Sequence, residues 1–380
     1  MLMKTQGASG QAWLKRGNRM ALIRRLRVHP GQSRVDLAHA LGLTKSTVSA
    51  LARELIDEGW LVEREVIATG DLGRRPTPLF VDPSRLLLLG TQVGIGHVRV
   101  VLTSLTGEVL QARSAGYDTS LDVEACIGEL TRTMLAVAAR CSKAQRIIGI
   151  GVGLPGGVDQ ARDQLVFAPH VHWHQVPFGA LLREALQGTP LSGVPVFMQN
   201  DADVAALGET EFNPSPVADP LLLVLVGEGV GAGLVVGGRL LTGARGLAGE
   251  VGHMVLQIDG PRCSCGRRGC AEALIGSRAL LQEDGASPPA PAVARAGHYL
   301  GVLLQNLAVA YDPACIVLGG GTAVALGDAL LAPVRATLQQ YAEAAGLPEP
   351  TLRLSRFGAD AIAVGAAALA GYRLTQPSPD

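Results

Sequence analysis

Three cysteines and one histidine lie close together in the stretch GEVGHMVLQIDGPRCSCGRRGCAEALIG, residues 249–276. The cysteines are Cys263, Cys265 and Cys270, and His253 precedes the first of them by ten residues. Three thiolates and one imidazole form the ligand set of a closed tetrahedral zinc site. The C-x-C-x4-C spacing differs from that of a zinc finger, so the sequence predicts a structural Zn2+ site built into a larger fold. The alternative is three free cysteines in a loop, although loops rarely gather cysteine without a metal or redox reason.

Two glutamates, Glu250 and Glu272, flank this cluster in the sequence. A structural metal would hold both carboxylates in fixed positions. Ionised carboxylates only accept hydrogen bonds, and hydroxyl groups supply the matching donors. The pattern therefore indicates a site for a polyhydroxylated ligand beside the metal.

The pattern G-E-x-G-H followed by C-x-C-G-x-x-G-C-x-E resembles the signature of the ROK family, which groups repressors, open reading frames and sugar kinases. The resemblance covers about residues 86–374 and implies that the histidine and the three cysteines bind zinc. It also implies that Glu250, His253 and Glu272 contact sugar hydroxyls. Asn200-Asp201, at the end of an apolar strand, matches the family's Asn-Asp pair, which grips the sugar and supplies the proton acceptor. The alternative for this pair is a plain Asn-Asp turn.

The phosphate side of the pattern departs from the kinases of this family. Their first phosphate motif, D-x-G-G-T, is matched by Gln92–Gly96, where Gln92 carries no charge to organise magnesium and Ile95 is bulky. Glu228 stands where kinases usually have a small hydroxyl residue and adds a negative charge near the phosphates. We therefore expect a sugar pocket without efficient phosphoryl transfer, so that the protein is not an enzyme and Asp201 is a vestigial base. Residual sugar kinase activity is the alternative.

Three histidines alternate in the segment FAPHVHWH, which resembles a family stretch that usually carries Asn where this chain has His170. This replacement would alter which hydroxyl or acetamido group the pocket reads. His170, His172 and His174 also lie on one side of an extended segment and form a possible extra metal site. The sequence favours the other reading, in which they are surface or packing histidines.

The elements before residue 82 have the pattern of a winged helix-turn-helix. Residues 1–12 are expected to be frayed, and a helical pattern from Met20 to Val28 stops at a Pro-Gly pair. Ser33 can cap a second helix with Asp36 in the capping-box position. Gly42 makes the turn, and Thr44 caps a third helix that Gly59 ends. This order of helix, tight turn and helix is typical of DNA-binding modules.

The third helix has one apolar and one polar face. The stripe expected to be buried consists of Val48, Leu51, Leu55 and Ile56. Any surface helix has a polar outer face, but two strands at 60–63 and 77–81 follow, around a glycine-hinged loop carrying two arginines. Such a loop is typical of a wing inserted into or beside the minor groove, and its GRRP sequence resembles the wing of the repressor branch of the family. The predicted DNA-binding residues are Thr44, Lys45, Ser46, Thr47, Ser49, Arg53, Arg74 and Arg75.

Beyond a predicted hinge at Asp82-Pro83-Ser84, strand-like runs and one long helix follow in the order strand, strand, strand, helix, strand. This order opens an actin-like ATPase lobe. The predicted fold class is α/β, with an N-terminal winged helix-turn-helix (1–82) followed by a two-lobed actin-like domain of the sugar kinase and Hsp70 type (83–380). The lobes are expected at about 83–195 and 196–360, with a small-residue C-terminal helix that returns to the first lobe.

Charge and composition agree with this division. Residues 1–82 hold 13 Lys and Arg against 8 Asp and Glu, whereas the rest holds 20 against 25. A basic module on an acidic body indicates a nucleic-acid contact confined to one end. Six cysteines, three of them clustered, favour metal binding in a reducing cytoplasm over disulfides. No apolar run reaches the roughly 18 residues of a membrane span, so no membrane partner is expected.

The sequence thus predicts a cytoplasmic, sugar-responsive transcriptional regulator, most simply a repressor. Within the family, the chain resembles repressors of the xylose or N-acetylglucosamine type. Its expected partners are operator DNA, a monosaccharide or sugar-derivative inducer, and a second or further copies of itself in a homodimer or homotetramer. One alternative is an active ATP-dependent sugar kinase with a DNA-binding appendage. Another is a regulator controlled by a protein partner instead of a sugar.

Overall fold

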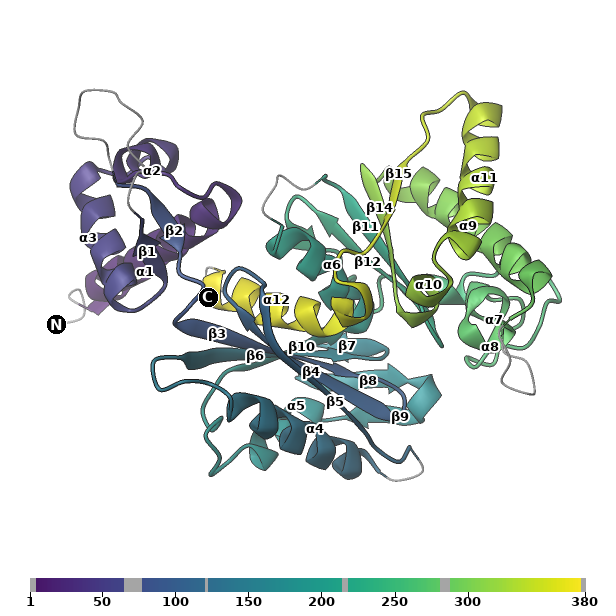
Figure 1. Cartoon of the computed structure of the whole chain (residues 1–380), viewed down its shortest axis with the longest axis horizontal. Coiled ribbons are helices and arrows are strands. Elements are labelled where there is room, and N and C mark those ends of the chain that lie inside the picture. The colour runs from purple at the N-terminus through teal and green to yellow at the C-terminus, as the bar shows by residue number, and fades with distance from the viewer. Residues whose placement is uncertain (1–4, 65–76, 120–121, 214–217, 281–287, 377–380) are drawn as a thin grey trace.

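The computed structural model describes residues 5–64, 77–119, 122–213, 218–280 and 288–376. A small N-terminal head and a larger body of two sheet-containing lobes make up the molecule (Figure 1). The predicted fold class, a winged helix-turn-helix followed by a two-lobed actin-like domain, is confirmed.

The head contains three helices and two short strands: α1 (Thr5–Val28), α2 (Arg34–Leu41), α3 (Lys45–Asp57), β1 (Leu61–Glu63) and β2 (Leu79–Val81). The capping-box prediction is confirmed, because the Ser33 hydroxyl accepts from Asp36 N and the Asp36 carboxylate accepts from Ser33 N. Gly42 makes the turn at φ +64°, a conformation that glycine adopts without strain. Residues 5–12, which were expected to be frayed, belong to α1, and residues 1–4 lie outside the described residues.

The helix α3 packs its apolar face into the head. Val48, Leu51 and Leu55 are buried as predicted, together with Ala52. Ile56 is only half-buried, because it lies at the edge of the stripe. The strands β1 and β2 pair antiparallel as expected for a wing. The wing loop itself, with Arg74 and Arg75, lies outside the described residues.

The body has two five-stranded mixed sheets. The first sheet has the order β10-β6-β3-β4-β5 and consists of β3 (Leu86–Val93), β4 (His97–Ser104), β5 (Val109–Gly116), β6 (Arg146–Leu154) and β10 (Val196–Asn200). A small sheet beside it contains β7 (Gly157–Asp159), β8 (Gln164–Ala168) and β9 (Trp173–Val176). The second sheet has the order β13-β12-β11-β14-β15 and consists of β11 (Leu221–Val226), β12 (Val230–Val236), β13 (Arg239–Leu240), β14 (Cys315–Gly319) and β15 (Thr351–Leu354).

Helices lie on both faces of these sheets (Figure 1). The outer helices of the first lobe are α4 (Val123–Ala138) and α5 (Phe178–Ala185), and those of the second are α7 (Ala271–Ile275), α8 (Ser277–Leu280), α9 (Ala290–Tyr311), α10 (Gly321–Leu326) and α11 (Asp328–Ala345). Between the lobes lie α6 (Asp201–Glu211), against the second sheet, and α12 (Ala361–Thr375), against the first. The C-terminal helix thus returns to the first lobe.

One boundary differs from the sequence expectation. The first lobe does not end at residue 195, because Val196–Asn200 pairs in parallel with β6 of the first sheet. The helix α9 begins at Ala290, and Pro291 fits its first turn, where its missing N–H is not needed. No helix in the described part of the chain is long and apolar enough to cross a bilayer.

The predicted hinge at Asp82-Pro83-Ser84 is a hydrogen-bonded turn. Both the amide and the hydroxyl of Ser84 donate to the Asp82 carboxylate, at 2.8 and 2.6 Å. One apolar cluster also runs continuously from Leu22 and Ile23 of the head to Leu88 of the first sheet and Ala363 of α12. The head is therefore packed on the body and not merely tethered to it.

A close contact between α6 and α12 predicts a strong size limit at Gly365. A Cβ atom at this position would lie 2.0 Å from the carbonyl oxygen of Val204, which is backbone and cannot turn aside. We expect Gly365→Ala to lower the free energy of unfolding by about 1–3 kcal/mol, the usual cost of overpacking. Denaturant unfolding checks this.

The matched control is Gly128→Ala in α4, where an added Cβ meets nothing within 4 Å. It should leave stability unchanged or raise it, because alanine favours the helix. Equal effects of the two substitutions would contradict the close-packing argument.

Candidate functional site

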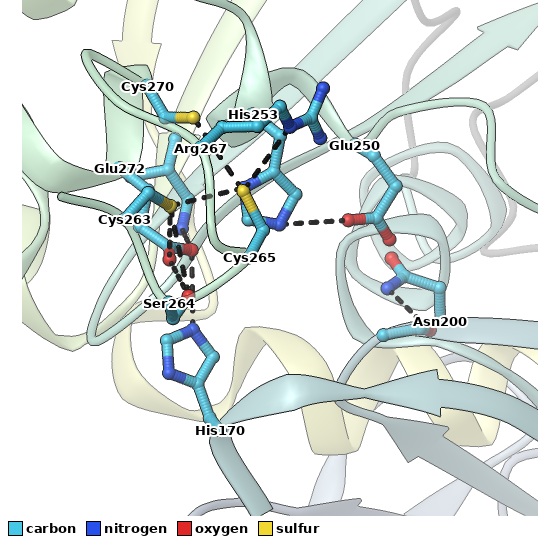
Figure 2. A network of polar contacts seen from close by, with 12 residues as sticks. His170, Asn200, Glu250, His253, Cys263, Ser264, Cys265, Arg267, Cys270 and Glu272 are labelled. Carbon is cyan, nitrogen blue, oxygen red and sulfur yellow. Dashed lines mark hydrogen bonds and ion pairs between the residues drawn. The ribbon is translucent and has the colours of Figure 1, made fainter. Parts of the chain in front are cut away.

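The four predicted metal ligands meet at one point in the second lobe (Figure 2). His253 ends a short 3-10 turn, Cys263 and Cys265 lie in the following loop, and Cys270 precedes α7. Cys263 Sγ is 3.6 Å from His253 Nδ1, and Cys265 Sγ is 3.8 Å from Cys270 Sγ. All four donor atoms lie within 4.8 Å of one another, so one ion could contact all of them.

The loop backbone explains how the cysteines converge. Cys263 N donates to Arg267 O at 2.9 Å, and Arg262 and Arg268 form an isolated antiparallel bridge that folds the loop back on itself. Gly269 has φ +69°, and a Cβ there would lie 1.6 Å from Gln257 O. Only glycine permits this turn, which aims Cys270 at its partners.

Polar groups around the cluster tie it to the rest of the site. Arg267 Nε lies 3.4 Å from Cys265 Sγ. Burial opposes ionisation of Cys265, but hydrogen bonds from Arg267, Cys263 and Cys270 together outweigh it and lower this pKa. Burial lowers the pKa of His253, which favours the neutral imidazole that a metal requires. Among the described residues no other cluster of histidine, cysteine or carboxylate side chains could hold an ion. The possible second metal site at His170, His172 and His174 is therefore not formed.

A cavity of about 610 Å3 lies between the lobes next to this cluster. Its lining includes all five predicted sugar-binding residues, which are Asn200, Asp201, Glu250, His253 and Glu272. The same cavity extends to the predicted phosphate end at Gln92, Ile95 and Glu228. The structure therefore brings together residues that lie up to 180 positions apart in the sequence.

Asn200 fixes the start of α6. Its Oδ1 caps the helix by accepting from Ala202 N at 2.9 Å and Asp203 N at 3.3 Å, while its Nδ2 donates to Gly156 O at 3.0 Å. This side chain thus joins β10 to the turn after β6 and points Asp201 into the cavity.

Two neighbouring acids have opposite electrostatic surroundings. Burial, followed by the charges of Asp201 and Glu272, raises the pKa of Glu250 to about 7. Burial also opposes ionisation of Glu272, but His170 and the Ser264 hydroxyl outweigh it and hold this pKa at about 2. Ser264 Oγ donates to Glu272 Oε1 at 2.7 Å, and His170 Nε2 lies 3.3 Å from Glu272 Oε2 without the alignment of a hydrogen bond. The cavity thus presents one firmly ionised carboxylate and one that readily holds a proton.

The sequence analysis did not predict roles for Ser264 and Asp203, and it did not place His170 in the cavity. Ser264 carries no signal except its place between two metal-ligand cysteines. Asp203 is 2% exposed, and its Oδ1 has no hydrogen-bond partner in the described structure. Burial, then repulsion by Asp201 and Glu250, raises its pKa well above the ordinary value. His170 was predicted as a replacement for Asn and as a surface or packing histidine, and it lines the cavity against Glu272.

The predicted DNA-binding side chains that the structure describes lie at the start and on the outer face of α3. Thr44, Lys45, Ser46 and Arg53 are exposed, and Thr47 and Ser49 are partly exposed. Thr44 Oγ1 accepts from Thr47 N at 3.1 Å and so caps the helix. Within the described residues neither Lys45 nor Arg53 forms an ion pair. Lys15 and Arg19 pair with Glu54 of α3, and Arg19 also pairs with Glu58 just after it. Their roles in DNA binding remain predictions.

A winged helix-turn-helix on a two-lobed actin-like body, with a cysteine-histidine cluster beside the interlobe cleft, defines a class of DNA-binding proteins built on a sugar-kinase fold. Residues 88–373 match the ROK family, and residues 16–62 match a winged helix-turn-helix DNA-binding family. The chain belongs to the ROK family.

Proteins named as repressors or transcriptional regulators are similar to this chain. The xylose repressor of Caldicellulosiruptor bescii is 31% identical over 271 residues, which are 70% of this chain and 66% of that protein, just under two thirds of its length. The xylose repressor of Bacillus subtilis is 28% identical over 334 residues, 81% of this chain and 83% of the relative. The crystal structure of a ROK family transcriptional regulator, a homologue of the E. coli MLC protein, has a TM-score of 0.75 at 26% identity and covers 96% of this chain and 97% of its own. Glucokinases also match.

The raised pKa of Asp201 predicts a pH-dependent stability. Burial shifts this pKa from the ordinary 3.8 to about 6, so folding opposes ionisation of the carboxyl group. Its stabilising contribution is complete below about pH 4 and is lost as the pH rises through about 6. We therefore expect Asp201→Asn to raise the melting temperature at pH 8 relative to wild type, with a smaller gain at pH 5. Thermal unfolding at both values measures this.

The control is Asp312→Asn at an exposed position with φ +44°, which asparagine adopts well. The difference in melting temperature between this control and wild type should be the same at pH 5 and pH 8. If Asp201→Asn raised the melting temperature more at pH 5 than at pH 8, the burial argument would be wrong.

Proposed function

We propose that this protein is a sugar-responsive transcriptional regulator, most simply a repressor, whose operator binding changes when a monosaccharide occupies the interlobe cleft. The single observation that carries the proposal is the packing of a winged helix-turn-helix and a kinase-type cleft into one molecule with a shared apolar cluster. The naming of similar proteins as xylose repressors supports it. The proposed division of the chain is 1–82 for the head and 83–380 for the body.

Operator DNA is the proposed partner of the head. The exposed start of α3 can enter a major groove, where Lys45 and Ser46 would reach phosphates and base edges, and Arg53 would reach the backbone. Arg74 and Arg75 of the wing would contact the minor groove. A palindromic operator has two half-sites, and each half-site binds one helix-turn-helix head. We therefore propose a homodimer or a homotetramer as the DNA-binding species.

The sugar-binding residues are proposed to be Asn200, Asp201, Glu250, His253 and Glu272. Glu272 stays ionised and accepts hydroxyl hydrogens, whereas Glu250, with its pKa near neutrality, can accept or donate. His253 turns Nδ1 to the cysteines, and its Nε2 lies 3.8 Å from a Glu250 oxygen at the cavity wall (Figure 2). A cluster of carboxylates that accept hydrogen bonds suits a ligand rich in hydroxyl groups and free of negative charge.

Phosphoryl transfer is not part of the proposal. Asp201 lies in the cavity, and glucokinases are among the relatives, so a kinase is the competing reading. The phosphate end of the cavity argues against it, because Gln92 and Ile95 replace an acid and a glycine of the kinase motif, and Glu228 adds negative charge. A like charge beside the phosphates would weaken nucleotide binding.

Zinc is the proposed metal. Two sulfurs bonded to one tetrahedral zinc at about 2.3 Å lie about 3.8 Å apart, and Cys265 Sγ and Cys270 Sγ have this separation of 3.8 Å. Glu250 beside the second nitrogen of His253 provides the carboxylate that commonly orients a metal-bound imidazole. All six cysteines are free thiols, as in a reducing cytoplasm, which is the proposed location. The bound metal would fix the loop that carries Ser264.

Metal removal should therefore loosen the second lobe. We expect about one zinc per chain by elemental analysis, and a lower melting temperature after chelation or in Cys265→Ser, by about 2–4 °C for each kcal/mol lost. Cys141→Ser, at a free thiol remote from the cluster, is the control and should retain the metal. A metal-free protein with unchanged melting behaviour would refute the structural role.

Sugar-dependent release of DNA tests the function directly. Duplexes selected by the protein from a random library serve as operator, and D-xylose and D-glucose serve as probes in a gel-shift titration. A coupling of about 5- to 150-fold in DNA affinity is expected for at least one probe. Glu250→Gln should lose the response, while Glu228→Gln at the phosphate end keeps it. Sugar-dependent release of ADP from ATP would instead assign the chain to the kinases.

A further inference from the structure

Two helices begin at the interlobe cavity and end at the head. Asn200 and Asp201, at the start of α6, line the cavity, and so do Ala361 and Ile362 at the start of α12. The opposite ends of both helices contact α1 of the head. Figure 1 shows the C-terminal end of α12 directly beneath the head and its other end toward the second lobe.

The two helices form one rigid unit. Residues 202–209 of α6 are all buried. A Cβ on Gly208 would lie 2.9 Å from the Cα of Gly365, and one on Gly365 would lie 2.0 Å from Val204 O. The backbones are thus in direct contact, with no long side chains between them to absorb movement. Close-packed elements of this kind transmit a displacement instead of damping it.

Two arginines of α1 hold the far ends of this unit. Arg27 Nη2 donates to the Glu211 carbonyl at 2.8 Å, and its Nη1 lies 2.6 Å from the Glu211 carboxylate, at the last residue of α6. Arg24 donates to the carbonyl of Thr375, the last residue of α12. Because they are three residues apart, the two side chains share one face of α1. Cationic side chains suit helix C-termini, where carbonyls lack partners and the helix dipole is negative.

The surroundings leave the head room to turn about this contact. A second cavity, of about 510 Å3, separates head and body beside Arg27 and is lined by Phe80 of the wing strand and Phe212 of the body. The Arg27 guanidinium lies 6.0 Å from the centre of the Phe212 ring. The arginines therefore hold α1 to the body between this open space and the apolar contact that Leu22 and Ile23 share with α12.

We propose that Arg24 and Arg27 are positioning residues that couple the cleft to the helix-turn-helix through the α6–α12 unit. This coupling rests on the proposed function and runs from the sugar cleft through α6 and α12 to the head. A ligand that draws Asp201 toward Glu250 and Glu272 shifts the start of α6, and the packed pair carries the shift to Glu211 and Thr375. The arginines then turn α1, whose last residue is joined to α2 by a five-residue link, 29–33. Sugar binding shifts the head only to the extent that its affinity differs between the two arrangements.

The test compares the double variant Arg24→Gln/Arg27→Gln with wild type in the full-length protein. The measured quantity is the ratio of operator Kd with and without D-xylose or D-glucose. We expect this ratio to fall from at least about 5-fold in wild type to below about 2-fold in the variant, while calorimetry shows sugar Kd for the DNA-free protein within about 2-fold of wild type. The milder Glu211→Gln, which keeps the backbone acceptor, should lose part of the ratio.

Arg25→Gln is the matched control. Arg25 lies between the two arginines on the same helix, but its Nε donates to Gln32 within the head at 2.9 Å. The control should retain the wild-type ratio, and zinc content and melting temperature verify that each variant is folded. A folded double variant with the full wild-type ratio would overturn the proposal.

A wild-type protein that ignores both sugars would count against the proposed function and is distinguishable from failure of the coupling. In that case the coupling is tested by comparing amide hydrogen exchange in the double variant with that in wild type. Faster exchange at the cleft ends of the two helices, residues 201–204 and 361–364, supports the connection between head and cleft. Unchanged exchange at those residues overturns it.

Discussion

Direct backbone contact between α6 and α12 is the constraint on which the rest of the molecule depends. The first sheet packs on one of these helices and the second sheet on the other, so their separation fixes the distance between the lobes. Glycines at positions 208 and 365 set that separation. The cavity then lies where both helices begin, and its shape follows from the angle between the lobes. A ligand that bridges the lobes therefore acts on the whole body.

Buried carboxyl groups in the cleft repel one another, and the cysteine-histidine cluster helps to orient one of them. Asp201, Asp203 and Glu250 are crowded together, and burial raises the pKa of each. Glu272 is held ionised from the opposite side by Ser264 and His170. Because Ser264 lies between two cysteines of the cluster, the loop that gathers the thiols also orients an acid of the pocket. Hydroxyl donors of a bound ligand would relieve the repulsion among the remaining acids.

Much of the architecture could be predicted because the signals are local. The capping box at Ser33, the turn at Gly42 and the cap at Thr44 are confirmed, since each depends on residues within one helical turn. The C-x-C-x4-C loop likewise gathers its thiols within eight residues. The boundary of the first lobe was wrong because β10 finds its partner only through pairing with β6, a distant segment. Asp203 and Ser264 escaped notice for the same reason, since their importance comes from neighbours that the fold supplies.

The last helix of the chain also has a consequence for synthesis. Ala363 and Ala367 of α12 belong to the same apolar cluster as Leu22 and Ile23 near the other terminus. An N-terminal module normally folds while the ribosome is still at work, but this head completes its apolar contact with the body only after α12 has been synthesised. A product terminated before α12 would keep the helix-turn-helix and lack part of its packing on the body.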